Sequence, residues 1–399
     1  MKRGAWHQCG DKSQKLVAEQ LEAGFGVGVI LSPRDLTAAN AADYATQYRA
    51  LGADVLIDPQ FYVPDFTNDN LESYGLSQFR QSVSLLNQVS DSDITQLGAE
   101  LRALNASLQS SAVIAPAVLY EAGRSDIAQL NAKLFKAAKG VGQSLGVPTF
   151  ATVGLARSVT SSTQTITWAL NRATALDADG WYYAFEFDEE RIPSGKDAVN
   201  RCCDAGLTLA ATGKPVLHAY AGPMGLLSFG FGASGVGIGH SQNLWKFTRE
   251  RWEGANAQGG GGNAPARFFS GALWGTIIYP DETGQLSAAL RAQILTPATP
   301  YCGPVLATPA LAWKRWEAGK HLVCVLAQAY DTLAASTDAR AHANAAIQRL
   351  TAALDTHAKV KELGLTLADD TDAYQANWRL AIADLLSKRA ADFDYLEML

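Results

Sequence analysis

The chain has 399 residues, of which 48% are hydrophobic and 18% charged, so it can build a large core and is not a disordered protein. Its formal net charge of -6 at pH 7 excludes a generally basic surface, so any binding of a polyanion depends on a local group of cations. The sequence shows neither a signal peptide nor an apolar run of the roughly 18 residues that span a bilayer, and we expect a cytoplasmic protein without membrane contact.

Short apolar runs alternate with amphipathic stretches over the first two thirds of the chain. Several amphipathic stretches lead into a Gly just before the next run, which is the usual end of a helix that turns back into a strand. The predicted strands are Gly26–Leu31, Val55–Ile57, Ala112–Leu119, Pro148–Val153, Trp181–Phe187, Pro215–Ala219 and Gly235–Ile238. The predicted helices between them include Ala39–Leu51, Ile127–Leu145, Thr163–Leu176 and Lys196–Thr212. This alternation predicts an α/β fold, a (β/α)8 barrel of the TIM type.

The last strand and the end of the chain are less regular. Both Arg267–Tyr279 and His321–Leu326 have the composition of an eighth strand. From Ala307 onward the sequence is almost wholly helical in pattern. We therefore expect a barrel over residues 1–300 and a helical extension over residues 301–399, which supplies the last strand if that strand lies near 321–326. A Gly-rich loop over residues 254–263 is expected near the catalytic rim.

Polar and aromatic residues follow most of the predicted strands. In a parallel barrel the carboxyl ends of the strands meet at one rim, where such enzymes hold their active sites. The second strand leads into Asp58, Gln60, Phe61 and Tyr62, a set that suits a planar, hydrogen-bonding ligand such as a nucleobase. Asp58 alone could equally cap the following loop, so the case depends on the other strand ends. These carry Arg34, Tyr120, Glu121, Arg157, Glu186, Asp188, His218, Tyr220 and His240.

The alternation of side chains along the fifth strand selects the acids that face inward. Phe185 and Phe187 share one face, so Glu186 and Asp188 share the other and are expected to join Asp58 in the barrel mouth. Two or three carboxylates around one pocket suit the hydrolysis of a glycosidic bond. The alternative is that Asp188 opens a solvated acidic loop with the two Glu residues that follow it.

Three segments resemble the tRNA-guanine transglycosylase family of TIM-type barrels. The run Val55-Leu56-Ile57-Asp58-Pro59-Gln60-Phe61 is similar to the family motif Asp-Ser-Gly-Gly-Phe-Gln, which also follows a short strand. Asp179–Tyr182 falls where the family has Asp-Gly-Tyr, and Lys214–Pro223 is similar to its strand Lys-Pro-Arg-Tyr-Leu-Met-Gly-Val-Gly. The resemblance covers roughly residues 26–245 and implies a pocket that acts on an N-glycosidic bond.

Departures from the family pattern change the expected chemistry. The family's nucleophilic Asp aligns at or near His240, and its base-reading loop is replaced by Ala184–Glu189. Its cysteine-rich zinc cluster is missing, although Cys302 falls in the corresponding region. We therefore expect hydrolysis in place of base exchange, no particular preference for guanine, and neither a metal nor another cofactor.

Because the resemblance includes DNA-acting members, the expected function is a DNA glycosylase. Such an enzyme would flip a modified base, such as a hypermodified or glucosylated cytosine of phage DNA, into its pocket and leave an abasic site in anti-phage defence. Asp58 would stabilise the sugar cation or activate water, Glu186 or Asp188 would assist departure of the base, and His240 would contact the sugar or phosphate.

The remaining site residues have expected binding roles. Stacking on the extruded base is assigned to Phe61, Tyr62, Tyr120 and Tyr220, and other substrate contacts to Arg34, Gln60, Glu121, Arg157 and His218. The cations expected to bind the DNA backbone are Lys246, Arg249, Arg251 and Arg267. The alternative for these cations is an ordinary helix surface, since Glu250 and Glu253 are interleaved with them.

Three other functions fit the same residues. A hydrolase of free nucleosides or small glycosides is favoured by the acidic pI of about 5.6. A transglycosylase that exchanges bases on DNA or tRNA is possible if Asp58 or Asp188 replaces the family nucleophile. A barrel that binds nucleic acid without catalysis is the third. The oligomeric state is not indicated by the sequence.

Overall fold

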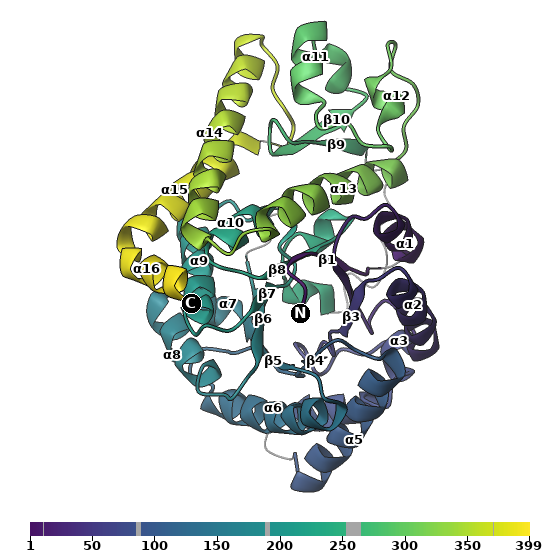
Figure 1. Ribbon diagram of the computed structural model, residues 1–399, viewed down its shortest axis with the longest axis vertical. Coiled ribbons are helices and arrows are strands. Elements are labelled where there is room, and N and C mark those ends of the chain that lie inside the picture. The colour runs from purple at the N-terminus through teal and green to yellow at the C-terminus, as the bar shows by residue number, and fades with distance from the viewer. Residues whose placement is uncertain (11, 85–88, 188–191, 253–264, 370) are drawn as a thin grey trace.

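The computed structural model describes residues 1–10, 12–84, 89–187, 192–252, 265–369 and 371–399. Eight strands form one parallel sheet in the order β3-β2-β1-β8-β7-β6-β5-β4, surrounded by helices (Figure 1). The strands are β1 (Gly4–Gln8), β2 (Gly28–Leu31), β3 (Asp54–Ile57), β4 (Val113–Ile114), β5 (Thr149–Leu155), β6 (Gly180–Phe185), β7 (Val216–His218) and β8 (Gly235–Ile238). The two outermost strands, β3 and β4, approach each other: the amide of Ser111, just before β4, donates to the carbonyl of Val55 in β3 at 2.9 Å. The predicted (β/α)8 barrel is confirmed.

The strand missing from the sequence-based set is β1. It pairs in parallel with β2 on one side and β8 on the other, and all five of its residues are buried. Both predictions for an eighth strand were wrong. His321–Leu326 lies inside helix α13 (Arg315–Ala334), because a short apolar run in a buried helix has the same composition as a strand. Arg267–Tyr279 instead forms a separate antiparallel hairpin of β9 (Ala266–Ser270) and β10 (Gly275–Tyr279).

Helices connect the barrel strands and pack on their outer face (Figure 1). The longer ones have recognisable ends: Thr37 and Ser162 accept hydrogen bonds from the first turns of α2 and α8, and Gly146 ends α6 at a φ of 68°. The helices up to β8 are α1 (Gln14–Glu22), α2 (Ala38–Ala50), α3 (Asp69–Glu72), α4 (Ser77–Ser84), α5 (Asp91–Leu108), α6 (Ser125–Leu145), α7 (Arg157–Thr160), α8 (Thr163–Ala173), α9 (Lys196–Ala210) and α10 (Gly225–Gly230).

The inside of the barrel is a packed core of large side chains. Trp6, which is fully buried, fits against Gly28 and Gly235 on the two neighbouring strands, where an added methyl group would collide with its ring. Tyr182 and Phe150 belong to the same interior cluster. A barrel filled in this way has no pore, so any site must lie at its rim.

The predicted helical C-terminal extension is confirmed, and a small subdomain precedes it. The extension comprises α13, α14 (Ala339–Glu362), α15 (Thr371–Lys388) and α16 (Ala390–Met398). The hairpin β9–β10 forms a separate small core with α11 (Ala288–Ile294), α12 (Gly303–Leu306), the start of α13 and the end of α14, at the upper end of Figure 1. This core extends across the predicted domain boundary at residue 300. No helix in the described part of the chain is both long and apolar enough to cross a membrane.

Replacement of Trp6 tests the assignment of β1 to the barrel. Trp6→Ala would leave a cavity in the interior core and should lower the free energy of unfolding by about 3–5 kcal/mol in urea denaturation. The control is Leu311→Ala, at a side chain that is 59% exposed, which should change stability by less than about 0.5 kcal/mol. A loss below about 1 kcal/mol for Trp6→Ala would contradict an interior position.

Candidate active site

The loop that follows β3 places Asp58 in the mouth of the barrel. This carboxylate is only 2% exposed and accepts three hydrogen bonds, each of 3.0 Å. The donors are the backbone N–H of Gln60, the hydroxyl of Tyr62 and the hydroxyl of Tyr182. Since Tyr182 comes from β6, the carboxylate connects opposite walls of the barrel.

Burial raises the pKa of Asp58 from its ordinary value of 3.8 to about 6. The three hydrogen-bond donors and the nearby positive charge of Arg251 act in the opposite direction, and desolvation outweighs them. A carboxyl group with a pKa near 6 can exchange its proton close to neutral pH, which is what a general acid or base requires.

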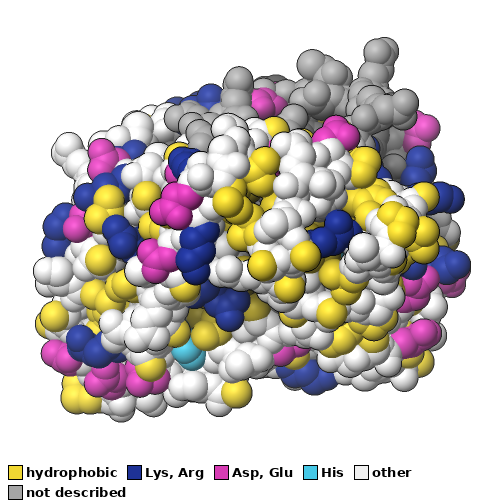
Figure 2. Space-filling view, turned by 90° about the horizontal axis from the view of Figure 1, so that it is seen from above, with side chains coloured by type: hydrophobic (Ala, Val, Ile, Leu, Met, Phe, Trp, Pro, Cys, Tyr) yellow, Lys and Arg dark blue, Asp and Glu magenta, His cyan; other side chains and the backbone are white. Residues whose placement is uncertain are grey.

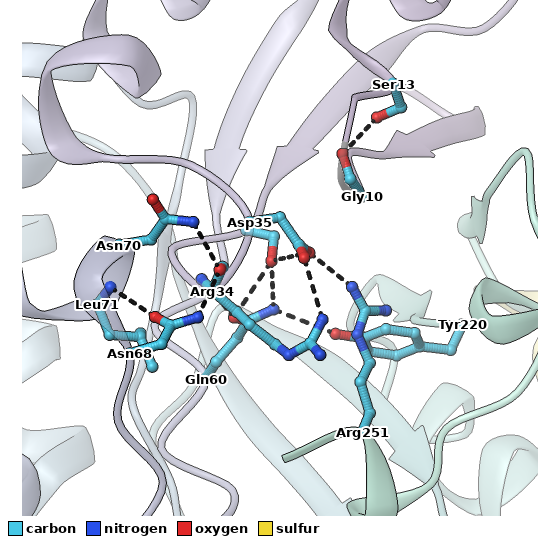
Figure 3. A network of polar contacts seen from close by, with 11 residues as sticks. Gly10, Ser13, Arg34, Asp35, Gln60, Asn68, Asn70, Leu71, Tyr220 and Arg251 are labelled. Carbon is cyan, nitrogen blue, oxygen red and sulfur yellow. Dashed lines mark hydrogen bonds and ion pairs between the residues drawn. The ribbon is translucent and has the colours of Figure 1, made fainter. Parts of the chain in front are cut away.

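Gln60 joins residues from three strand ends, and Figure 3 shows its side chain between Arg34 and Tyr220. Its amide nitrogen donates to Ser32 Oγ at 3.0 Å and to the hydroxyl of Tyr220 at 3.4 Å, and its amide oxygen accepts from the N–H of Arg34 at 3.2 Å. Gln60 and Tyr220 both have positive φ values, of 56° and 55°, which non-glycine residues seldom adopt. Such strained backbone concentrates at functional sites, where the surrounding structure maintains it.

Arg80 of α4 is a site residue that the sequence analysis missed. Its buried guanidinium donates to the carbonyls of Gln60, Val63 and Phe66 at 2.7, 3.2 and 3.3 Å, and it lies 5.2 Å from the centre of the Phe61 ring. Arg80 thus fixes the course of the loop that carries Asp58. No motif surrounds it in the sequence, so only the fold reveals this role.

Gln8 was missed as well, because β1 was not recognised. Its side-chain oxygen accepts from the N–H of Tyr220 at 2.7 Å, and it lines the same space as Asp58.

The segment that follows β8 covers this mouth. Phe247 and Trp252 pack their rings against Tyr62, with centroids 4.9 and 5.3 Å away, and Phe247 also contacts Tyr220 at 5.4 Å. The space left beside Asp58 is too small to hold even a water molecule. A substrate must therefore displace part of this segment.

Arg251 holds the covering segment by an ion pair inside the mouth. Its guanidinium lies 2.6 Å from the carboxylate of Asp35, which also accepts from Arg34 at 3.0 Å and from Ser32 Oγ at 2.7 Å (Figure 3). It also lies 5.6 Å from the ring centres of Tyr220 and Trp252. Arg251 therefore points into the barrel.

Glu186 makes the second attachment of the covering segment. This buried carboxylate accepts from the N–H of Arg157 at 2.6 Å and from the N–H and Nε of Arg249 at 2.9 and 3.3 Å. Arg249 also reaches Glu121 at 3.2 Å. Glu186 thus supports the cover and does not share hydrogen-bond donors with Asp58. Asp188 lies outside the described residues, as does the predicted Gly-rich loop over 254–263.

Three predicted substrate contacts lie on the wrong side of the strands or loops. His218 bonds Ser228 Oγ at 2.7 Å and faces Tyr183, outside the barrel, because its neighbours Leu217 and Ala219 take the inward positions. Burial lowers the pKa of His218 to about 3. Tyr120 and Phe61 also belong to the outer core, between strands and helices. These three residues do not reach the mouth.

The cations predicted for DNA binding do not form one open surface. Arg249 and Arg251 point inward, Lys246 is only 8% exposed, and Arg267 pairs with Asp369 at 2.7 Å. His240 and Arg267 line a second cleft, away from Asp58. Figure 2 shows positive and negative side chains interspersed over the face seen from the upper end of Figure 1.

No family model matches the sequence, and no curated protein matches it either. Among solved structures, the chain is similar to the 3-dehydroquinate dehydratase of Aquifex aeolicus VF5, with 11% identity over 65% of this chain and 99% of that one and a TM-score of 0.36. It is also similar to a glycerol uptake operon antiterminator-related protein of Thermotoga maritima MSB8, with 12% identity over 62% of this chain and 100% of that one and a TM-score of 0.32. At such TM-scores these similarities do not bear on the activity of this protein.

The raised pKa of Asp58 predicts a pH-dependent stability. Between the unfolded value of 3.8 and the folded value of about 6 the native state binds more protons than the unfolded state, so stability falls as the pH rises through this range. From pH 4 to 7 the wild type should lose about 2 kcal/mol relative to Asp58→Asn, measured by urea denaturation. Parallel pH profiles for the two proteins would contradict the raised pKa.

The role of Glu186 predicts a change in local opening. Glu186→Gln removes the charge that holds Arg249, and amides of residues 246–252 should exchange with deuterium about tenfold faster in mass spectrometry. The matched control is Glu250→Gln, on the same segment, whose carboxylate lies 3.6 Å from Arg157 at the surface. Equal exchange in both variants would show that Glu186 does not hold the cover.

Proposed function

We propose that the protein hydrolyses an N-glycosidic bond, with Asp58 as the acid–base group. The observation that carries this proposal is the Asp58 cluster: a buried carboxylate with a pKa near 6, oriented by two tyrosine hydroxyls at the carboxyl end of a parallel barrel. The resemblance of the sequence around Asp58 to transglycosylase-like barrels favours a nucleobase as the leaving group.

The chemistry divides among a few side chains. Ionised Asp58 takes a proton from water, and the oxygen of that water attacks the anomeric carbon as the bond to the base breaks. The base leaves with the electron pair of that bond and takes up a proton from solvent. Its negative charge also stabilises the positive charge that develops on the sugar. Tyr62 and Tyr182 hold the carboxylate in one orientation, so the base form acts without rearrangement. The amide of Gln60 is placed to bond the edge of a ligand that replaces its present partners.

The fuller proposal for the substrate is a modified base in DNA, flipped out of the helix and excised in anti-phage defence. A second candidate is a free nucleoside. The inward pairing of Arg249 and Arg251 favours this second candidate, because it withdraws charges that a duplex would need. Both substrates require the segment that carries Phe247 and Trp252 to leave the mouth.

Release of free bases tests this function. The protein is incubated with modified phage DNA, with unmodified DNA and with nucleosides, and released bases are identified by mass spectrometry. Asp58→Asn should lower the rate by about 10²–10⁴-fold, as expected for loss of a general base. Asp65→Asn, an exposed acid in the same loop, should leave the rate unchanged. Failure to release a base from any of these substrates would refute the proposal.

The pH dependence of the reaction tests the role of the carboxylate. The value of kcat/KM should rise with pH and level off above about 6, where Asp58 is ionised. Tyr182→Phe removes a hydrogen bond that lowers the pKa of Asp58, so the inflection should move to higher pH. An inflection that stays in place would contradict Asp58 as the titrating group.

A further inference from the structure

A second cleft lies between the barrel rim and the small subdomain. It has a volume of about 330 Å³. Its walls come from the residues after β8, including His240, Ser241 and Gln242, from the hairpin β9–β10, and from the first turns of α13. Clefts between structural units are preferred positions for ligands, and this volume falls within the usual range for a small-molecule site.

The wall of the cleft offers an aromatic surface. Trp316 of α13 is half-buried, and its ring meets that of His240 edge-on, with centroids 6.1 Å apart. Gly319, one turn further along, lets the helix approach closely, since a methyl group there would lie 3.3 Å from the carbonyl of His240. The tryptophan is thus held in place by a helix that packs on the barrel, and it can stack on a planar ring.

Positive charge lies beside this surface. Arg315 lines the cleft at the N-terminus of α13, and no carboxylate partner for it is found among the described residues. Arg267, the other lining cation, is neutralised by Asp369 at 2.7 Å. The N-cap residue of this 20-residue helix is Lys314, whose side chain has no hydrogen-bond acceptor, so the first amides are not capped by it and add partial positive charge. Glu317 is in the same turn but does not line the cleft.

We propose that this cleft binds one nucleotide unit, with its phosphate on Arg315 and its base against Trp316. Ser241 and Gln242 supply polar groups for the edge of the base or for the sugar. In this proposal His240 contributes to ligand binding at the second cleft, and it does not have the catalytic role predicted from the sequence. The site stands apart from Asp58, so nucleotide binding here does not depend on the hydrolytic reaction. The ligand is either a free nucleoside monophosphate or one unit of a nucleic-acid strand.

Isothermal titration calorimetry of the full chain with adenosine 5′-monophosphate, adenosine, inorganic phosphate and a short single-stranded oligonucleotide tests this site. Arg315→Gln should weaken binding of the monophosphate about tenfold or more, because it removes a charge-assisted contact. Arg315 is exposed, so this variant should fold. Trp316→Leu should weaken binding of the monophosphate but not of inorganic phosphate. Arg102→Gln removes the same charge from α5, at the opposite end of the molecule in Figure 1, and should bind like the wild type.

The outcomes separate the possible sources of the ligand. Binding of the monophosphate supports a free nucleotide, and binding of the oligonucleotide alone supports a unit within a strand. Absence of both, or equal binding by the wild type, Arg315→Gln and Trp316→Leu, would overturn the proposal. Asp58→Asn should bind the monophosphate as tightly as the wild type does, although it should lose base release. Either proposal can therefore fail without the other.

Discussion

The burial of one carboxylate, Asp58, is the constraint on which the rest of the site depends. A charged group removed from water is tolerated only when hydrogen bonds replace its hydration. Those bonds come from Tyr62 and the backbone of Gln60 in its own loop and from Tyr182 across the barrel. The loop must therefore keep Gln60 at a positive φ, and Arg80 holds the loop in that conformation through four backbone carbonyls.

Ion pairs between buried acids and arginines also hold the segment that covers the mouth. Asp35 and Glu186 are acids on the barrel side, and Arg251 and Arg249 are their partners on the covering segment. Because each pair is wholly or partly removed from water, its Coulomb attraction is stronger than at an open surface. These cations serve to close the barrel, so their clustering in the sequence does not by itself indicate a polyanion site. A substrate that enters the mouth must break or bypass these pairs.

Much of the fold could be predicted from the sequence, because parallel strands buried on both faces are near-continuous runs such as Val55–Ile57. The strand β1 could not, since Gly4–Gln8 is short and includes His7 and Gln8. At the site, Asp58, Gln60 and Tyr62 were predicted because they directly follow a strand. The direction in which a side chain points was harder to predict, since His218 and Tyr120 lie at strand ends yet point outward. The roles of Arg80 and Asp35 depend on tertiary contacts that no local motif encodes.

The titration of the Asp58 carboxyl carbon is the most direct test of this account. Carbon-13 NMR of the protein labelled at aspartate carboxyl groups, with Asp58→Asn to assign the resonance, would follow that group alone. The account predicts a midpoint near pH 6, since burial outweighs the three donors and the charge of Arg251. A midpoint at or below the ordinary value of 3.8 would mean that Asp58 is a permanently ionised structural anchor, and acid–base catalysis in the barrel mouth would be contradicted.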